Sequence, residues 1–179
     1  MENQSIYQRL VEGNQKYIKA SKMTGEISSA IRKETAQEGQ HPFITIITCS
    51  DSRVIPEAIF SCGIGEVFTI RVAGNVISDE VLGSIEYATS HLHTPVVMVL
   101  GHTHCGAIHS CLHGESSGYV TSLMDSIKVC IKDEKDETKA SILNILGQAK
   151  TIQSKLDCHA FEVVPAIYDI ESGRVRFLD

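Results

Sequence analysis

The segment Phe43–Thr48 reads Phe-Ile-Thr-Ile-Ile-Thr, which is short and apolar on both faces. A strand of this kind is typical of a parallel sheet with helices packed on either side of it. Val67–Val72 and Val96–Leu100 predict two more strands, and apolar residues at helical spacing after Ser78 predict a helix between them. Because strands alternate with helices, we predict an α/β fold with a mostly parallel central β-sheet and flanking helices.

The remaining patterns predict further helices and an edge strand. Ile6–Ile18 carries apolar residues at helical spacing, with Ser5 as a possible N-cap, and Ser28 or Ser29 begins a second helix that ends near Gly39. Further expected elements are a helix from Pro56 to near Gly63, helices at 123–131 and 140–156, a strand at 161–169, and an antiparallel edge strand at 175–177. We expect residues 1–179 to form a single domain, given the length of the chain.

Composition and charge exclude several classes of protein. The formal net charge is −6 and the pI about 5.7, which argues against a nucleic-acid partner because such proteins need a basic face. The apolar runs are much shorter than the ~20 residues of a membrane span, and charges at Glu2, Arg9 and Glu12 argue against a signal peptide. We therefore expect a cytoplasmic protein with no membrane partner. In that setting the six cysteines favour metal binding or catalysis over disulfides.

Two polar segments follow the first and third predicted strands. The first is Cys49-Ser-Asp-Ser-Arg53, and the second is Gly101-His-Thr-His-Cys-Gly106. Ligands of parallel sheets bind beyond the carboxyl ends of the strands, so the two segments meet in one crevice if these strands are neighbours. Together they offer two thiolates and an imidazole, and three protein ligands with one open position are typical of catalytic zinc.

Spacing alone leaves the details of this site open. His102 and His104 compete for one ligand position, and either Asp51 or His104 could close the coordination shell. Asp51 and Arg53 form either a surface ion pair or a catalytic pair in which the guanidinium keeps the carboxylate ionised. Cys105 is expected at the start of a helix, where backbone N–H groups stabilise a thiolate.

These residues resemble the signature of β-class carbonic anhydrases. The pairing of Cys49-Ser-Asp-Ser-Arg53 with Gly101-His-x-x-Cys-Gly106 is specific to that family, and the resemblance covers most of the chain. It includes Leu10–Asn14, Gly65–Asn75 and Ala166–Gly173. The resemblance implies one zinc ion per subunit, with Cys49, His102 and Cys105 as its ligands. It also implies that Asp51 and Arg53 act as the catalytic pair.

The resemblance also implies a substrate pocket. Gln40 matches the glutamine of the family's pocket, and Phe68, Ala73 and Tyr87 match its apolar residues. We add Gly106, which lets the backbone approach closely because it has no side chain. Family sites lie at a dimer interface, so we expect a homodimer or a dimer of dimers in which Gln40, Phe68 and Tyr87 act across subunits.

This resemblance predicts a subtype, a packing role for the first helices and a function. Gln, Phe and Tyr at the pocket positions are typical of the plant-like subtype, and the N-terminal helices, about residues 5–38, are expected to pack on a partner subunit. The implied function is reversible hydration of carbon dioxide to bicarbonate and a proton, by attack of zinc-bound hydroxide on CO2. The alternatives are a hydrolase of carbonyl sulfide or carbon disulfide on the same fold, or a non-catalytic zinc-binding module.

Overall fold

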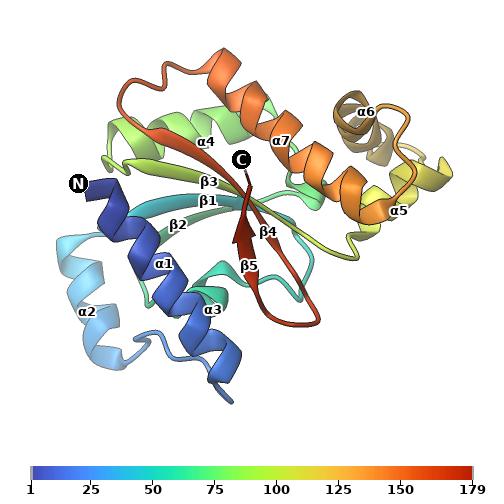
Figure 1. The fold of residues 1–179 in the computed structure, drawn as a ribbon. Coiled ribbons are helices and arrows are strands. Elements are labelled where there is room, and N and C mark those ends of the chain that lie inside the picture. Colours follow the sequence, from blue (N-terminus) through green and yellow to red (C-terminus); the bar gives the residue numbers. More distant parts are fainter. Residues whose placement is uncertain (1, 179) are drawn as a thin grey trace.

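The computed structural model describes residues 2–178, with side chains from Ser5 onward, and contains one five-stranded sheet (Figure 1). Its strands are β1 (Ile44–Thr48), β2 (Val67–Arg71), β3 (Val96–His102), β4 (Glu162–Tyr168) and β5 (Val175–Phe177), in the order β2-β1-β3-β4-β5. All neighbouring strands are parallel except the β4–β5 pair, which is antiparallel. The predicted α/β fold with an antiparallel edge strand is therefore confirmed.

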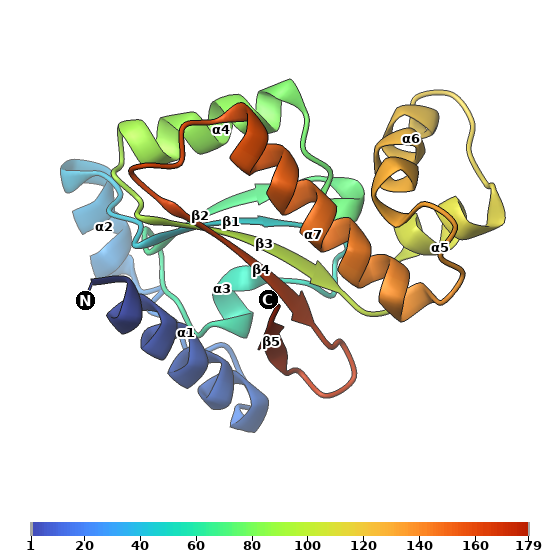
Figure 2. The ribbon, with the colours of Figure 1, turned by 45° about the horizontal axis from the view of Figure 1, so that its top comes forward.

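Helices cover both faces of the sheet. They are α1 (Glu2–Lys19), α2 (Ser29–Glu38), α3 (Pro56–Ile59), α4 (Asp79–Ser90), α5 (Gly106–His113), α6 (Val120–Ile131) and α7 (Glu137–Lys155), with a 3-10 turn η1 at Ala73–Asn75. Figure 2 shows α4 and α7 over one face, α1 and α3 over the other, and α5 and α6 beyond one end of the sheet. None of the helices in the described part of the chain is long and apolar enough to cross a membrane.

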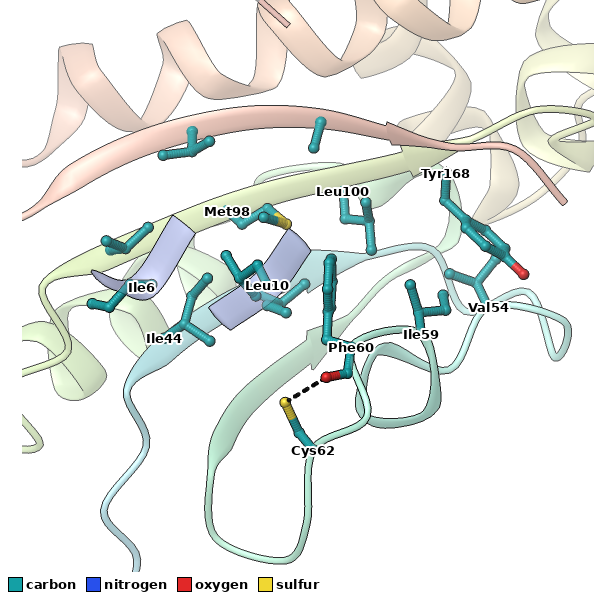
Figure 3. Packing of buried hydrophobic residues seen from close by; sticks show 14 residues of the cluster. Ile6, Leu10, Ile44, Val54, Ile59, Phe60, Cys62, Met98, Leu100 and Tyr168 are labelled. Atoms are coloured by element: carbon teal, nitrogen blue, oxygen red, sulfur yellow. Dashed lines mark hydrogen bonds between the residues drawn. The ribbon is translucent and has the colours of Figure 1, made fainter. Parts of the chain in front are cut away.

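The core lies on both sides of β1 and β3, in which every residue is buried. On one face Ile6 and Leu10 of α1 pack against Ile44 and Met98 (Figure 3). On the other face Ile47 packs in a second cluster with α4 and α7. Burial on both faces explains why these strands lack the alternating pattern of a half-exposed strand.

The local structure differs from the sequence prediction at several points. Ser5 lies inside α1, which begins at Glu2, so the N-cap prediction there was wrong. Helix α3 ends at Ile59 rather than near Gly63, because Ser61 takes a positive φ of 54° and the chain turns back. Ser28 does cap α2, with its hydroxyl accepting the Ile31 N–H.

The order of the strands reverses at β1, where β2 joins one side and β3 the other. The register pairs Thr48 with Leu100, which brings the residues after β1 next to the end of β3. Strand β3 continues through Gly101 to His102, beyond the predicted end at Leu100. A Cβ at Gly101 would overlap the side chain of Ile145 on α7, so glycine here allows the close approach of this helix.

Candidate metal centre

Three buried side chains converge at the carboxyl ends of β1 and β3. Cys49 follows β1, His102 is the last residue of β3, and Cys105 occupies the N-cap position of α5. Their ligand atoms all lie within 4.8 Å of one another. Tetrahedral zinc binds sulfur and nitrogen at ~2.0–2.3 Å, so donors this close together can share one ion.

The His102 ring is oriented for ligation. Its Nδ1 lies 2.9 Å from the Thr103 carbonyl oxygen, which makes Nδ1 the protonated nitrogen and leaves a lone pair on Nε2. Nε2 is buried and has no hydrogen-bond partner among the described residues. An unpaired buried nitrogen is costly, and a cation between His102 and the two sulfur atoms would satisfy it. The donor set therefore fits a zinc ion.

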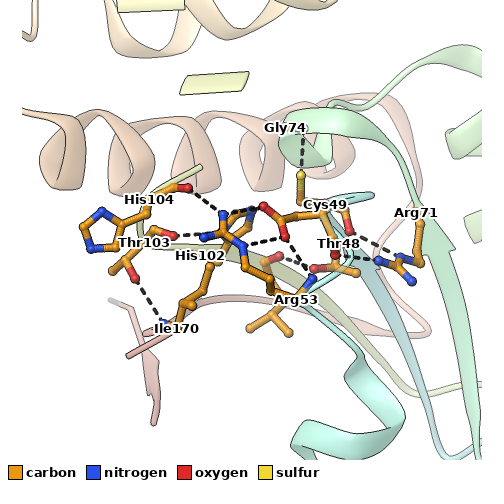
Figure 4. Close-up of polar contacts among 11 residues, drawn as sticks. Thr48, Cys49, Arg53, Arg71, Gly74, His102, Thr103, His104 and Ile170 are labelled. Carbon is orange, nitrogen blue, oxygen red and sulfur yellow. Dashed lines mark hydrogen bonds and ion pairs between the residues drawn. The ribbon is translucent and has the colours of Figure 1, made fainter. Parts of the chain in front are cut away.

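The two cysteine thiols affect each other's ionisation in opposite directions. The interaction between the two side chains lowers the pKa of Cys49 and raises the pKa of Cys105. The Gly74 N–H also donates to Cys49 Sγ at 3.3 Å (Figure 4). A divalent cation binds thiolates, so metal binding would favour the deprotonated form of both cysteines.

The Asp51 carboxylate lies beside this group. Its two oxygens accept hydrogen bonds from Arg53 Nε at 2.9 Å and Arg53 Nη2 at 2.7 Å, and Oδ2 lies 4.0 Å from His102 Nε2. The side-chain hydrogen bonds from Arg53 lower the pKa of Asp51 to about 2. Asp51 is therefore a carboxylate at any physiological pH, and the bidentate guanidinium fixes its orientation.

Backbone carbonyls around the site are held by two arginines. Arg53 Nη2 donates to the His104 carbonyl at 3.1 Å, which links the segment after β1 to the segment after β3. Arg71, at the end of β2, donates to the carbonyls of Cys49 at 3.3 Å and Asp51 at 2.7 Å. His104 itself is exposed and lies outside the three-residue group.

The expected pocket residues fall into two sets. Ala73 and Gly106 lie next to the site. Ala73 precedes Gly74, whose N–H contacts Cys49, and Gly106 follows Cys105, which belongs to the Cys–His–Cys group. Gln40 precedes β1, whereas Cys49 follows it. A five-residue strand spans roughly 16 Å, so Gln40 lies toward the amino end of β1, away from the Cys–His–Cys group.

Phe68 and Tyr87 also lie away from the Cys–His–Cys group. Phe68 pairs with Thr45 near the start of β1, and its ring lies 6.2 Å from the ring of Tyr87 on α4. One chain therefore does not bring Gln40, Phe68 and Tyr87 to its own Cys–His–Cys group.

Several residues that contact the site had no predicted role. Arg71, Gly74 and Thr103 act through hydrogen bonds to or from the backbone. A charged residue at the carboxyl end of a strand next to β1 was a usable signal for Arg71. No pattern in the sequence could indicate the contacts of Gly74, because they depend on a turn formed by tertiary packing.

The fold and the site together define a class: an α/β protein with a metal-ligating Cys–His–Cys group at the point where the strand order reverses. Residues 44–175 match the family model of the carbonic anhydrases. A carbonic anhydrase of Synechocystis sp. is 40% identical over 96% of this chain and 71% of its own length. Carbonic anhydrase 2 of Mycobacterium tuberculosis is 28% identical over 98% of this chain and 92% of its own.

A solved structure has the same fold. It is a tetrameric β-carbonic anhydrase of Sordaria macrospora, with a TM-score of 0.72 and 27% identity, covering 84% of this chain and 87% of that one. The chain belongs to the β-class carbonic anhydrase family. The resemblance identified from the sequence is thereby confirmed for the family, while the plant-like subtype stays a prediction.

Proposed function

We propose that the protein catalyses the reversible hydration of CO2 to bicarbonate and a proton, with one zinc ion held by Cys49, His102 and Cys105. The observation that carries this proposal is the buried, unpaired His102 Nε2 facing two cysteines beside an ionised carboxylate. A zinc ion held there would supply the nucleophile by lowering the pKa of coordinated water. The cytoplasmic location and the plant-like subtype belong to the same proposal.

The residues of the chain have separate tasks in this mechanism. Asp51 accepts a hydrogen bond from the attacking water or hydroxide. This bond orients a lone pair of the attacking oxygen toward CO2. Arg53 keeps Asp51 ionised and holds it away from the ligand group through two hydrogen bonds. Because Asp51 is engaged by Arg53, the geometry favours an open coordination position over a closed, non-catalytic zinc module.

We further propose that a second copy of the chain completes the pocket. Gln40, Phe68 and Tyr87 lie away from the Cys–His–Cys group of their own chain, and Tyr87 leaves 47% of its surface exposed. In a homodimer or a dimer of dimers these side chains would reach the site of another subunit. A tetrameric relative in the family supports this arrangement.

The test is zinc analysis combined with stopped-flow CO2 hydration from mildly acidic to alkaline pH. We expect one zinc per chain and activity that rises toward alkaline pH, because two thiolates cancel the charge of the zinc ion and make bound water less acidic. Parallel assays with carbonyl sulfide and carbon disulfide separate the alternative hydrolase. Zinc-loaded protein that hydrates no CO2 at any pH would contradict the proposal.

A further inference from the structure

Two buried amide side chains of α7 contact the turn next to Cys49. Asn144 and Gln148 are 1% and 3% exposed. Asn144 Nδ2 donates to the Gly74 carbonyl at 2.9 Å, and Gln148 Oε1 accepts the Ile77 N–H at 2.9 Å. The two amides also bond to each other, from Gln148 Nε2 to Asn144 Oδ1 at 3.2 Å. They bind the segment between β2 and α4 at two points, Gly74 and Ile77.

This segment has an unusual backbone. Gly74 has a φ of 66° and Asn75 a φ of 47°, so two successive residues occupy the left-handed region. A non-glycine residue pays a conformational cost there, and such a turn persists only when its surroundings hold it. A Cβ at Gly74 would lie 2.7 Å from Ile127 Cδ1 of α6, so a side chain there would also have to displace this methyl group.

Gly74 is bonded on both sides. Its carbonyl accepts from Asn144, and its N–H donates to Cys49 Sγ at 3.3 Å. We propose that Asn144 and Gln148 are positioning residues for the metal centre, which hold the 73–75 turn so that the Gly74 N–H donates to the Cys49 sulfur. The inference rests on the proposed zinc site and assigns a task to side chains that do not touch it.

The physical consequence lies in the charge on sulfur. A hydrogen bond from a backbone N–H withdraws electron density from a thiolate, so it weakens the donation from that thiolate to a metal. Losing the bond would make Cys49 a more electron-rich ligand, which changes the charge-transfer energy. It would also leave the sulfur less fixed in position, and this loss of orientation is what lowers metal affinity. Changes to groups that orient metal ligands typically reduce metal affinity by roughly 10–100-fold.

A purely structural role for the two amides predicts a different result. In that case their loss would lower the stability of the folded protein and leave the electronic properties of the site unchanged. The deciding measurement is therefore spectroscopic. In the cobalt(II)-substituted protein, the thiolate-to-cobalt charge-transfer band in the near ultraviolet reports the electron density on the ligating sulfur.

The experiment compares Asn144→Leu and Gln148→Met with a matched control, Ser141→Ala. Ser141 lies on the same helix and is 2% exposed, but its hydroxyl donates to Glu137 within α7. We expect the band to move to longer wavelength in the first two variants and to stay at the wild-type position in the control. Zinc affinity, measured by competition with a chelator, should fall about tenfold or more in the same two variants.

A band at the wild-type wavelength in the folded Asn144→Leu and Gln148→Met proteins would overturn the inference. If neither variant folds, amide hydrogen exchange of the zinc-loaded wild-type protein decides. The inference expects the Gly74 amide to be as protected as those of β1 and β3, and rapid exchange at Gly74 would overturn it. None of these readouts involves CO2, and a wild-type protein that binds no metal would instead contradict the proposed function.

Discussion

At the scale of single residues, the most consequential contact is the fork between Asp51 and Arg53. Both carboxylate oxygens are occupied by the guanidinium, and the Arg53 backbone N–H adds a third bond to Oδ1 at 2.9 Å. Such bidentate pairs fix orientation as well as charge. This pair could be predicted from the sequence because its members are two positions apart. The hydrogen bonds of Arg71 could not, because they join β2 to the segment after β1.

Replacing Asp51 by Asn tests its catalytic task. The amide is similar in size but uncharged, and it cannot act as the ionised acceptor. We expect Asp51→Asn to retain one zinc per chain and to lose roughly 10²–10⁴-fold in kcat/KM, the usual contribution of a positioned acid or base. Metal content and stopped-flow hydration measure both quantities. Asp157→Asn, at an exposed position, is the control, and full activity in Asp51→Asn would remove this residue from the mechanism.

Cys62 gives a prediction about pH. This thiol is 2% exposed, and burial raises its pKa to about 12. The unfolded chain ionises Cys62 at pH ~8.5, so its contribution to stability is complete below that pH and is lost as the pH rises toward 12. Between pH 8.5 and 10 the wild-type protein should lose roughly 2 kcal/mol through this thiol alone, at ~1.4 kcal/mol per pH unit.

The measurement is urea unfolding of zinc-saturated protein at pH 8.5 and pH 10, for the wild type and Cys62→Ala. The variant lacks the titrating thiol, so its free energy of unfolding should fall less over this interval. Cys62 is remote from the Cys–His–Cys group and packs in the cluster beneath α1, which keeps the comparison independent of metal binding. Equal decreases in the two proteins would show that Cys62 ionises equally in both states.

At the scale of secondary-structure elements, prediction succeeded where the pattern was local. Strands β1 and β3 were found because burial on both faces leaves continuous apolar runs. The η1 turn was missed because its left-handed residues are held by α7, about seventy positions later in the chain. The extension of β3 to His102 was missed for a related reason, since its last pairs depend on β4.

Asn14 shows how a single amide joins elements. Its Nδ2 donates to the carbonyls of Gly173 at 2.8 Å and Ile59 at 3.3 Å, and its Oδ1 accepts the Val175 N–H at 3.1 Å. These bonds attach α1 to α3 and to the β4–β5 turn of the same chain. We expect Asn14→Ala to cost about 2–3 kcal/mol, because it leaves buried backbone groups unpaired.

Chemical denaturation at fixed protein and zinc concentrations measures this cost. The neighbouring side chain Gln15 is exposed, so Gln15→Ala is the matched control and should change the free energy of unfolding by less than about 0.5 kcal/mol. If Asn14→Ala were as stable as this control, α1 would not be attached to its own chain through Asn14.

At the scale of the whole molecule, apolar surface remains uncovered. Helix α2 has no fully buried side chain among the described residues. Two apolar residues add to this uncovered surface: Ile27, just before the helix, is 50% exposed, and Ile31 is only partly covered. A helix with so little packing gains little from its own chain, because most helical stability in proteins comes from tertiary contacts. That the N-terminal helices, about residues 5–38, pack on a partner stays a prediction; α2 has the more uncovered surface, and α1 also packs on its own sheet.

The pocket gives an independent reason to expect assembly. Gln40 lies just after Gly39, the C-cap of α2. The structure separates it, together with Phe68 and Tyr87, from the Cys–His–Cys group of the same chain. If these side chains belong to a working pocket, the site is complete only in an oligomer. Assembly and catalysis should then be lost together, while metal binding, which uses residues of one chain, should survive.

The variant Ile27→Glu combined with Ile31→Glu tests this coupling by placing one charge on α2 and one just before it. We expect light scattering to give an oligomeric mass for the wild type and a smaller mass for the variant, because a buried unpaired carboxylate is strongly unfavourable at an interface. CO2 hydration should fall at least tenfold, and zinc should stay at one per chain. Val129→Glu, on the exposed surface of α6 at 77% exposure, is the control and should change neither mass nor activity. A fully active monomer would mean that Gln40, Phe68 and Tyr87 complete no pocket in a second subunit.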